Sequence, residues 1–301
     1  MSEEAKQVHR GKDGFLFLSG GRHGVFELFS GASSPAPGTA MVFCCNLNAR
    51  SDYCELTDRE FRMVVFPDKC VALRDKVGLA TPLGSLYARC FADQVAASGA
   101  AWQVRYPLGP LDGHEDAFTR TDTHYSALGN LAMVKAILTG LVPDAMLAEG
   151  GARIEACIVE RPGICGDLGT KLSPAPQETA TVLRGSPVVL HMRGNGIKGG
   201  NDGICILVDS PEALGKKTLL IFGDSFFRAL LPMLAVFYRR VIFCRTRYFH
   251  TEMVEAFAPD DIFCGVAERY LSRCNPDADR PHFLSYPLLL GLTCPPVVPR
   301  S

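Results

Sequence analysis

Four short, almost wholly apolar segments in the last third of the chain constrain its fold most strongly. They cover residues 204–208, 218–222, 241–245 and 261–266, and helical apolar patterns occupy 226–238 and 251–257 between them. Strands that are apolar along their whole length are buried on both faces, as in a parallel sheet covered by helices. Alternating strands and helices also imply right-handed crossovers. We therefore predict an α/β fold, a three-layer α/β/α sandwich with a mainly parallel central sheet.

The first two thirds of the chain add elements of the same two kinds. Strands are expected at 15–18, 61–66 and 102–106, and amphipathic helices at 83–97 and 127–138. Ser126 is the expected cap of the second helix. Because α/β folds of this length often form one unit, we predict a single domain over residues 1–301.

Two segments differ from this pattern in composition. Residues 161–203 contain 13 glycine or proline residues, and only 186–192 within them reads as a strand. Since so long a loop-rich stretch exceeds an ordinary connection, we expect it to form a lid or a wall of a site. Residues 275–301 are rich in proline and are expected to form a tail.

Composition and charge exclude several classes of protein. The chain carries 31 basic and 32 acidic residues, a net charge of −1, which gives no reason to expect a nucleic-acid partner. No apolar stretch approaches the roughly 18–20 residues that a transmembrane helix needs. Twelve cysteines without a Cys-x-x-Cys pair argue against a structural zinc site. With a polar N-terminus that lacks a signal-peptide core, they predict reduced thiols in a cytoplasmic protein, or a periplasmic one if a signal had been removed.

The sequence Gly223-Asp224-Ser225-Phe226 follows a predicted buried strand and precedes a predicted helix. Sites in open α/β sheets form beyond the carboxyl ends of the strands. A serine there also lies at a helix N-terminus, where free N–H groups and the helix dipole stabilise an oxyanion. Ser225 is therefore a candidate nucleophile, with Gly223 and Asp224 as further site residues. The competing interpretation is that Asp224 or Ser225 only caps the helix.

A serine nucleophile needs a base, and His124 in Asp122-Thr123-His124-Tyr125 is the strongest candidate. It lies in a polar loop just before a predicted helix. Asp122 could accept the imidazole Nδ1 proton and so fix the tautomer and orientation of the ring. His191 and His250, each near a strand end, are the competing bases. An isolated Asp-x-His pair is also typical of a surface loop.

Several short motifs together resemble the SGNH hydrolases and, within them, the alginate O-acetyltransferase (AlgX/AlgJ-type) branch. Gly223-Asp224-Ser225 is similar to the Gly-Asp-Ser block, and Asp122-Thr123-His124-Tyr125 to the Asp-Thr-His-Trp block, in the permuted order of that branch. Segments 11–18, 66–69 and 268–270 are similar to its opening Gly-x-Asp-Gly-Trp-Leu-Phe, its strand-end Pro-x-Lys and its late Glu-Arg-aromatic motifs. The resemblance spans about residues 10–271, with Phe15 and Tyr125 where the branch has Trp.

The resemblance implies a serine O-acyltransferase or esterase, with acetyl as the acyl group, that acts on a carbohydrate or polysaccharide through an acyl-enzyme. Ser225 would attack the acyl ester, His124 would be the general base and Asp122 its orienting acid. Asn195 could supply an oxyanion donor, or it could simply belong to a glycine-rich turn. The other residues expected near the oxyanion or the substrate are Arg193, Tyr125, Arg245, Asp167 and Lys171.

No bound cofactor and no metal are predicted. The alginate enzymes act in the periplasm with a membrane acyl donor, so a cytoplasmic protein that resembles them would need another donor, such as acetyl-CoA or an acetylated ester. A partner acyltransferase or glycan-assembly protein is expected, and the oligomeric state is not readable. Two alternatives stay open: a non-catalytic binding or scaffold protein on the same fold, and a metallophosphoesterase, which would need further His and Asn ligands.

Overall fold

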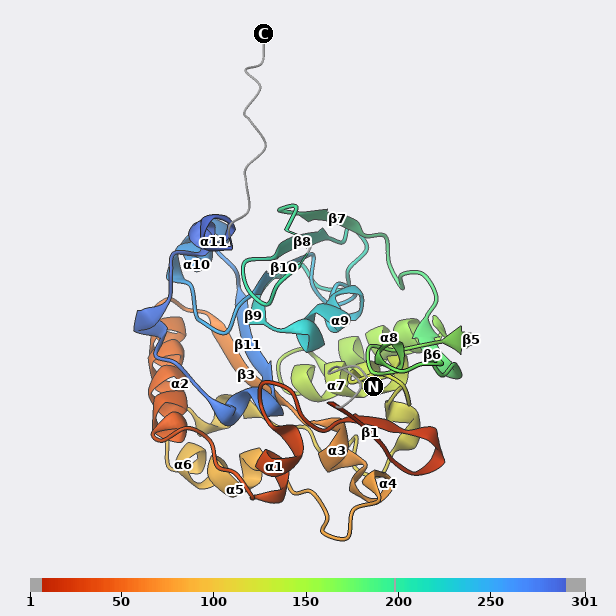
Figure 1. The fold of residues 1–301 in the computed structure, drawn as a ribbon. Helices are drawn as coiled ribbons and strands as arrows, with labels where there is room; N and C mark the ends of the chain where they lie inside the picture. The colour runs from red at the N-terminus through yellow and green to blue at the C-terminus, as the bar shows by residue number, and fades with distance from the viewer. Residues whose placement is uncertain (1–6, 198, 291–301) are drawn as a thin grey trace.

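The centre of the molecule is a seven-stranded sheet, shown in a computed structural model that describes residues 7–197 and 199–290 (Figure 1). In spatial order its strands are β4 (Val104–Arg105), β3 (Glu60–Phe66), β11 (Asp261–Ala267), β9 (Thr218–Gly223), β10 (Arg240–Arg245), β8 (Cys205–Asp209) and β7 (His191–Gly194). The first five run parallel to one another, whereas β8 and β7 pair antiparallel with their neighbours. The predicted α/β fold with a mainly parallel sheet is confirmed.

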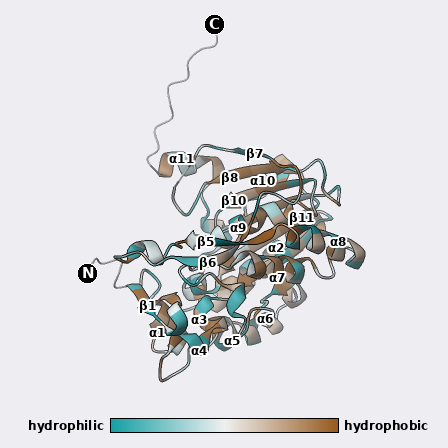
Figure 2. Ribbon diagram, turned by 90° about the vertical axis from the view of Figure 1, so that its right-hand side faces the viewer, coloured by the Kyte–Doolittle hydropathy of each residue, from teal (hydrophilic) through white to brown (hydrophobic). Residues whose placement is uncertain are grey.

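The strand expected at 204–208 is present, but the prediction that it runs parallel to its neighbours was wrong. It is β8, which pairs antiparallel with β10. Only turns, and no helix, connect β8 to β9, so the chain has no crossover that could make these strands parallel. Most residues of β8 are only half-buried. Figure 2 shows that its residues are nevertheless largely hydrophobic, which explains why the sequence resembles a central strand.

Helices cover both faces of the sheet. In Figure 1, α7 (Ala127–Leu138), α8 (Asp144–Glu155) and α9 (Ser225–Leu234) lie on one side, and α2 (Thr39–Leu56) and α10 (Thr251–Phe257) on the other. The smaller elements are β1 (Val8–Arg10), β2 (Leu16–Leu18), α1 (Val25–Ser30), α3 (Lys69–Ala72), α4 (Arg74–Val77), α5 (Leu86–Cys90), α6 (Ala92–Ala96), β5 (Ile158–Ile164), β6 (Glu178–Leu183) and α11 (Tyr286–Leu289). As predicted, Ser126 caps α7 by accepting a hydrogen bond from the Gly129 N–H.

Helix α2 escaped prediction because polar side chains occupy part of its buried face. Arg50 is buried and donates from Nε and a terminal nitrogen to Asp277, at 2.7 and 2.8 Å. Ser51 is also buried and accepts a hydrogen bond from Gln103. These polar contacts replace an apolar stripe. The helix expected at 83–97 is instead two short helices, α5 and α6, that meet at Phe91, whose φ and ψ are −125° and −35°.

The loop-rich segment 161–203 contains more regular structure than expected. Strands β5 and β6 form an antiparallel pair, and the expected strand at 186–192 begins only at His191, as β7. The expected tail is also partly folded, because Phe283 and Tyr286 are buried against the body of the protein. Residues 291–301 of that tail lie outside the described residues. Of the predicted free thiols, all eleven cysteines in the described ranges are unpaired. Cys294 falls outside them. No helix among the described residues is long and apolar enough to cross a membrane.

Candidate active site

Ser225 lies at the corner between the central strand β9 and helix α9. It is the first residue of α9, and Asp224 is the N-cap. The Asp224 carboxylate accepts hydrogen bonds from the backbone N–H groups of Phe226 (2.9 Å) and Ala267 (2.7 Å), which joins the start of α9 to the end of β11. The first N–H groups of a helix have no partner within it. The corner therefore presents a serine hydroxyl beside free main-chain donors.

Gly223 leaves room for the helix that follows it. A Cβ atom at Gly223 would lie 2.7 Å from Cδ2 of Phe227, and one at Gly265 on the neighbouring strand would lie 2.3 Å from the same ring. The φ angle of Gly223 is outside the left-handed region, so space rather than turn geometry requires glycine here. The buried Phe227 ring thus fixes the first turn of α9 against the sheet.

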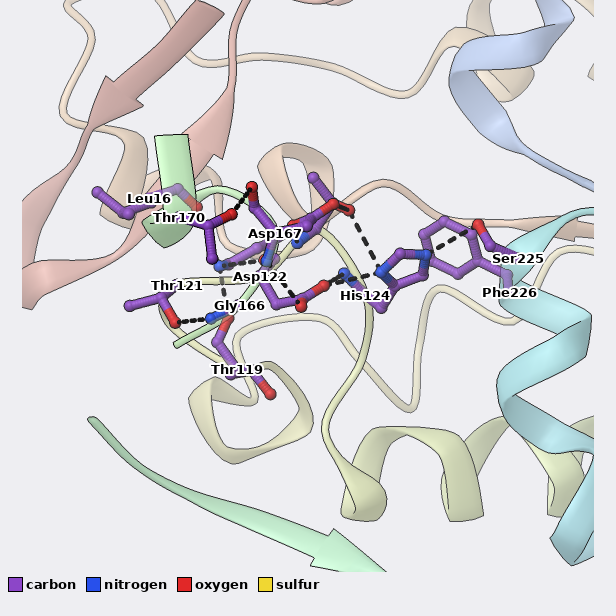
Figure 3. A network of polar contacts seen from close by, with 12 residues as sticks. Leu16, Thr119, Thr121, Asp122, His124, Gly166, Asp167, Thr170, Ser225 and Phe226 are labelled. Atoms are coloured by element: carbon purple, nitrogen blue, oxygen red, sulfur yellow. Dashed lines mark hydrogen bonds and ion pairs between the residues drawn. The ribbon is translucent and has the colours of Figure 1, made fainter. Parts of the chain in front are cut away.

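His124 connects Ser225 to Asp122 in a continuous chain of hydrogen bonds (Figure 3). His124 Nε2 lies 2.8 Å from Ser225 Oγ, and His124 Nδ1 lies 2.7 Å from Asp122 Oδ1. Asp122 also accepts from the His124 backbone N–H at 2.8 Å. Because an ionised carboxylate can only accept, the Nδ1 atom carries the proton and Nε2 is free to accept the hydroxyl proton of Ser225.

The electrostatics of Asp122 suit this arrangement. Burial raises the pKa of this carboxyl, but the hydrogen bonds and charge interaction with His124 lower it by more, so the net pKa is below the usual value. Asp122 therefore stays ionised and able to hold the imidazole at neutral pH. The His124 ring is also held from one side by Phe226, with ring centroids 4.9 Å apart.

The segment after β5 supports the loop that carries Asp122 and His124. Asp167 accepts from the Thr123 N–H (2.7 Å) and hydroxyl (2.6 Å), and its own N–H donates to Asp122 at 3.1 Å. A Cβ atom at Gly166 would lie only 2.4 Å from the Cβ of Asp122. This close approach explains a glycine within the 161–203 segment and makes that segment a wall of the site.

Ser225 and His124 open into a cavity of about 840 Å³. Of the residues that the sequence indicated, Gly223, Asp224, Asp167, Lys171 and Arg245 also line it. Arg245 ends β10 beside Gly223, donates to Asn201 at 2.8 Å, and keeps its Nε atom buried with no partner in the described part of the chain. Glu268 does not pair with Arg245, because its carboxylate accepts hydrogen bonds from Ser85, Tyr87 and Tyr106.

Besides Asp122, three of the indicated residues do not line this cavity. Arg193 is an exposed residue of β7, and Asn195 follows that strand. The Asn195 side chain donates to the Gly203 carbonyl (2.8 Å) and accepts from the Cys205 N–H (3.2 Å), so it is used within the hairpin and not as an oxyanion donor. Tyr125 is buried beneath the site, where its hydroxyl donates to the Pro67 carbonyl at 2.7 Å.

The competing histidines lie elsewhere. His250 is fully buried and bonds Glu252 and Thr246, while His191 is exposed on β7. A different serine–histidine contact, which the sequence did not indicate, lines the same cavity: His23 Nδ1 lies 2.7 Å from Ser272 Oγ. No carboxylate in the described residues bonds the other nitrogen of His23. Among the residues that the structure describes, only Ser225 therefore belongs to a complete serine–histidine–carboxylate chain.

Asp122, His124 and Asp167 are the one group of three possible metal ligands among the described residues. The nitrogen atoms of His124 face Asp122 and Ser225, and both Asp167 oxygens accept from Thr123. A metal ion would have to break several of these hydrogen bonds. The group also lacks the further His and Asn ligands of a two-metal phosphoesterase.

Sequence reasoning assigned no role to two buried charges under the site. Arg269 lines the cavity, lies over the Phe226 ring with its guanidinium carbon 5.3 Å from the centroid, and forms an ion pair with Asp68. Lys69 contacts the loop that carries Asp122. Both Asp68 and Lys69 directly follow β3, as Ser225 follows β9. The rule that parallel strands end at one edge of the sheet could have placed them near the site.

No family model and no curated protein sequence matches this chain. Solved structures do. Bacillus cereus PatB1, in a structure with a sulfonyl adduct, matches with a TM-score of 0.59 at 12% identity and covers 79% of this chain and 90% of its own. A DHHW family protein from Eubacterium siraeum matches with a TM-score of 0.54 at 15% identity, covering 81% and 88%. The O-acetyltransferase domain of Pseudomonas putida AlgJ matches with a TM-score of 0.50 at 15% identity, covering 94% and 99%.

The fold is SGNH-like. These matches confirm the structural side of the resemblance that the motifs indicated, including the likeness to the AlgJ domain. At 12–15% identity they show the fold alone. The chemistry of this chain therefore depends on its own residues.

Proposed function

We propose that this protein is a serine-dependent O-acyltransferase or esterase that works through an acyl-enzyme on Ser225. The single observation that carries the proposal is the hydrogen-bonded chain from Ser225 through His124 to Asp122. It lies at the N-terminus of α9 and opens into a large cavity. The alternative of a non-catalytic scaffold predicts that Ser225 and His124 lie too far apart for a hydrogen bond. Their separation is 2.8 Å.

The geometry accounts for each step of acyl transfer. His124 Nε2 takes the hydroxyl proton while Ser225 Oγ attacks the acyl carbonyl, and Asp122 stabilises the imidazolium that forms. The developing oxyanion is stabilised by the N–H groups at the start of α9, with Arg245 as a further candidate donor. His124 then returns the proton to the leaving oxygen or sulfur. Water or a sugar hydroxyl, activated by the same imidazole, releases the acyl group.

The charge of the cavity points to substrates that carry negative charge. Seven of its lining residues are basic (Arg22, Arg50, Lys171, Arg245, Arg247, Arg269 and Arg273) and three are acidic (Asp167, Asp202 and Asp224). Arg50 and Arg269 are neutralised by Asp277 and Asp68. The other five basic residues form no ion pair within the described ranges. An anionic acetyl ester should therefore show a lower KM than a neutral one, with a difference that shrinks as salt is added.

Acetyl is the acyl group we propose, and a carbohydrate is the acceptor. Both follow the resemblance to the alginate branch, and the AlgJ structure is an O-acetyltransferase domain. The donor would be acetyl-CoA or an acetylated ester for a cytoplasmic enzyme, and a partner acyltransferase is an alternative source. Turnover of an acetylated chromogenic ester, measured with and without sugar acceptors, separates transfer from hydrolysis: an acceptor that is acetylated in proportion to ester consumed identifies a transferase.

The test of the proposal is covalent labelling of Ser225. PatB1 has been obtained with a sulfonyl adduct, so an arylsulfonyl fluoride is a suitable probe. The wild-type protein should gain one sulfonyl group on the peptide that contains Ser225 and lose esterase activity in parallel. Ser225→Ala should show neither labelling nor turnover. Ser272→Ala, the matched control in the same cavity, should keep both. Labelling of Ser225→Ala at the wild-type rate would contradict the proposal.

A further inference from the structure

Lys69 is a buried cation that forms no ion pair with any residue in the described ranges. It begins α3, shortly after the end of β3, and the residue is 4% exposed. Its ammonium group lies within hydrogen-bond distance of four backbone carbonyls, those of Leu16 (3.0 Å), Thr119 (2.7 Å), Arg120 (2.9 Å) and Asp122 (3.0 Å). Burying a charge costs free energy unless polar groups compensate it. Four converging carbonyl dipoles provide that compensation here.

The four carbonyls come from two segments that are distant in sequence. Leu16 belongs to β2, whereas Thr119, Arg120 and Asp122 belong to the loop that leads to His124. Figure 3 shows Leu16, Thr119 and Asp122. The Leu16 N–H also donates to the Arg120 carbonyl at 2.8 Å. The rings of Phe15 and Phe17 face the ammonium, at 5.3 and 5.4 Å. Lys69 therefore joins this loop to the N-terminal strand pair β1–β2.

A single antiparallel bridge between Phe118 and Tyr125 joins the ends of the loop, and no helix or strand fixes the backbone between them. On the other side of the loop, Glu178 accepts from the N–H groups of Arg120 and Thr121, at 2.8 and 2.7 Å, and Leu168 and Gly169 donate to the Thr121 carbonyl. Within it, Lys69 is the contact that holds the carbonyl of Asp122 itself. The orientation of a residue's side chain follows that of its backbone, so a shift of this peptide would move the carboxylate away from His124 Nδ1.

We propose that Lys69 is a positioning residue of the active site, an inference that rests on the function proposed above. Lys69 fixes the backbone of Asp122, and through it the tautomer and orientation of the general base His124. It does not touch substrate, because it is not among the residues that line the large cavity. Burial lowers the pKa of its ammonium group, and the nearby carboxylates of Glu178, Asp122 and Asp167 raise it. Burial has the larger effect, and the net pKa is about 7.

The first arm of the test separates kcat from KM. Lys69→Met keeps the length of the side chain and removes its N–H donors. With a chromogenic acetyl ester we expect kcat to fall roughly tenfold to a hundredfold, the scale of a displaced catalytic group, and KM to stay within about twofold. Lys69→Gln, which keeps two N–H donors, should fall between Lys69→Met and the wild type. It also serves if Lys69→Met does not fold.

The second arm asks whether Lys69 acts through Asp122. In an Asp122→Ala background, Lys69→Met should lower kcat by less than about threefold, because the group that it positions is already missing. Arg59→Met is the matched control: Arg59 also donates to carbonyls, of Thr57 and Pro259, but at the opposite edge of the sheet. That control should leave kcat unchanged in both backgrounds.

Several outcomes would overturn the inference. An equal fall in kcat with and without the Asp122 carboxylate would show a general structural role. A rise in KM with normal kcat would place Lys69 at the substrate, and an unchanged kcat would show no role. Failure of the proposed function is separately visible, because Ser225→Ala would then keep its activity. If Ser225→Ala is inactive and Lys69→Met has the kcat of the wild type, only the inference about Lys69 fails and the proposed function stands.

Discussion

The two halves of the candidate site are built in different ways. Ser225 begins α9 just after the central strand of a buried sheet, at a corner fixed by strand pairing, the Asp224 cap and the packed ring of Phe227. His124 and Asp122 stand on an irregular loop, held by side chains that bond its backbone, chiefly Lys69, Glu178 and Asp167. The first half shares the stability of the core, and the second depends on a few buried polar contacts.

This difference has a consequence for mutations. A change in the Ser225 half disturbs packing and should lower stability and activity together. A change in a contact that supports the His124 half should lower activity while most of the fold stays intact, since few core contacts depend on it.

The largest effect comes from removing the reacting groups themselves. Ser225→Ala and His124→Ala should each lower kcat by about 10⁴- to 10⁶-fold, as in other triads. The double variant should be no worse than either single one, since both groups act in the same step. Steady-state kinetics on an acetyl ester measures this. Losses that multiply in the double variant would mean that the two halves work independently.

In the Ser225 half, Gly223→Ala should destabilise the fold. The added methyl group would meet the Phe227 ring, and such overpacking costs roughly 1–3 kcal/mol. Denaturant unfolding followed by fluorescence or circular dichroism gives the change in free energy of unfolding. Gly194→Ala is the control, because its nearest neighbour would be 3.5 Å away, an ordinary contact. Equal stability of Gly223→Ala and the wild type would show that the corner is not tightly packed.

In the His124 half, Asp167→Ala should act on rate and not on folding. It removes the acceptor of two hydrogen bonds from Thr123 and leaves the core untouched, so we expect kcat to fall roughly threefold to tenfold with an almost unchanged melting temperature. Asp202→Ala, which removes another carboxylate of the same cavity, should leave kcat unchanged. A large drop in melting temperature for Asp167→Ala would show that the His124 half, like the Ser225 half, contributes to the stability of the fold.

The smallest effect is a pH dependence of stability. The folded-state pKa of Asp122 lies below its usual value of 3.8, so its contribution to stability is present above that value and is lost as the pH falls further. The difference in melting temperature between wild type and Asp122→Asn should therefore be constant near neutral pH and shrink below about pH 4. A difference that instead grew in acid would mean that Asp122 is protonated in the native state.

The parts of the fold that sequence could predict are those with regular apolar periodicity. Strands β3, β9, β10 and β11 and helix α7 show clear patterns, so the corner at Ser225 could be located. Helix α2 could not, because Arg50 and Ser51 lie on its buried side with partners far away in sequence. The direction of β8 depends on which strand it pairs with, and hydropathy does not report that.

The same distinction applies to the site. Ser225, His124 and Asp122 could be singled out because each lies beside a recognisable helix start or in a motif, and the structure brings them together. For Asn195 the sequence left two roles open, because a glycine-rich turn that bonds itself and one that bonds an oxyanion look alike in sequence. Lys69 and Glu178 could not be assigned, since they act on backbone carbonyls and N–H groups that carry no residue-specific signal.

The central claim is that acyl transfer proceeds through Ser225, and trapping the acyl-enzyme tests it most directly. The protein is mixed with an acetyl ester, quenched in acid within the first turnover, digested and weighed by mass spectrometry. We predict one acetyl group on the peptide that contains Ser225, formed more slowly in Asp122→Asn and absent in Ser225→Ala. Turnover of the ester with no acetyl group on Ser225, or with acetyl on another residue such as Ser272, would contradict the account.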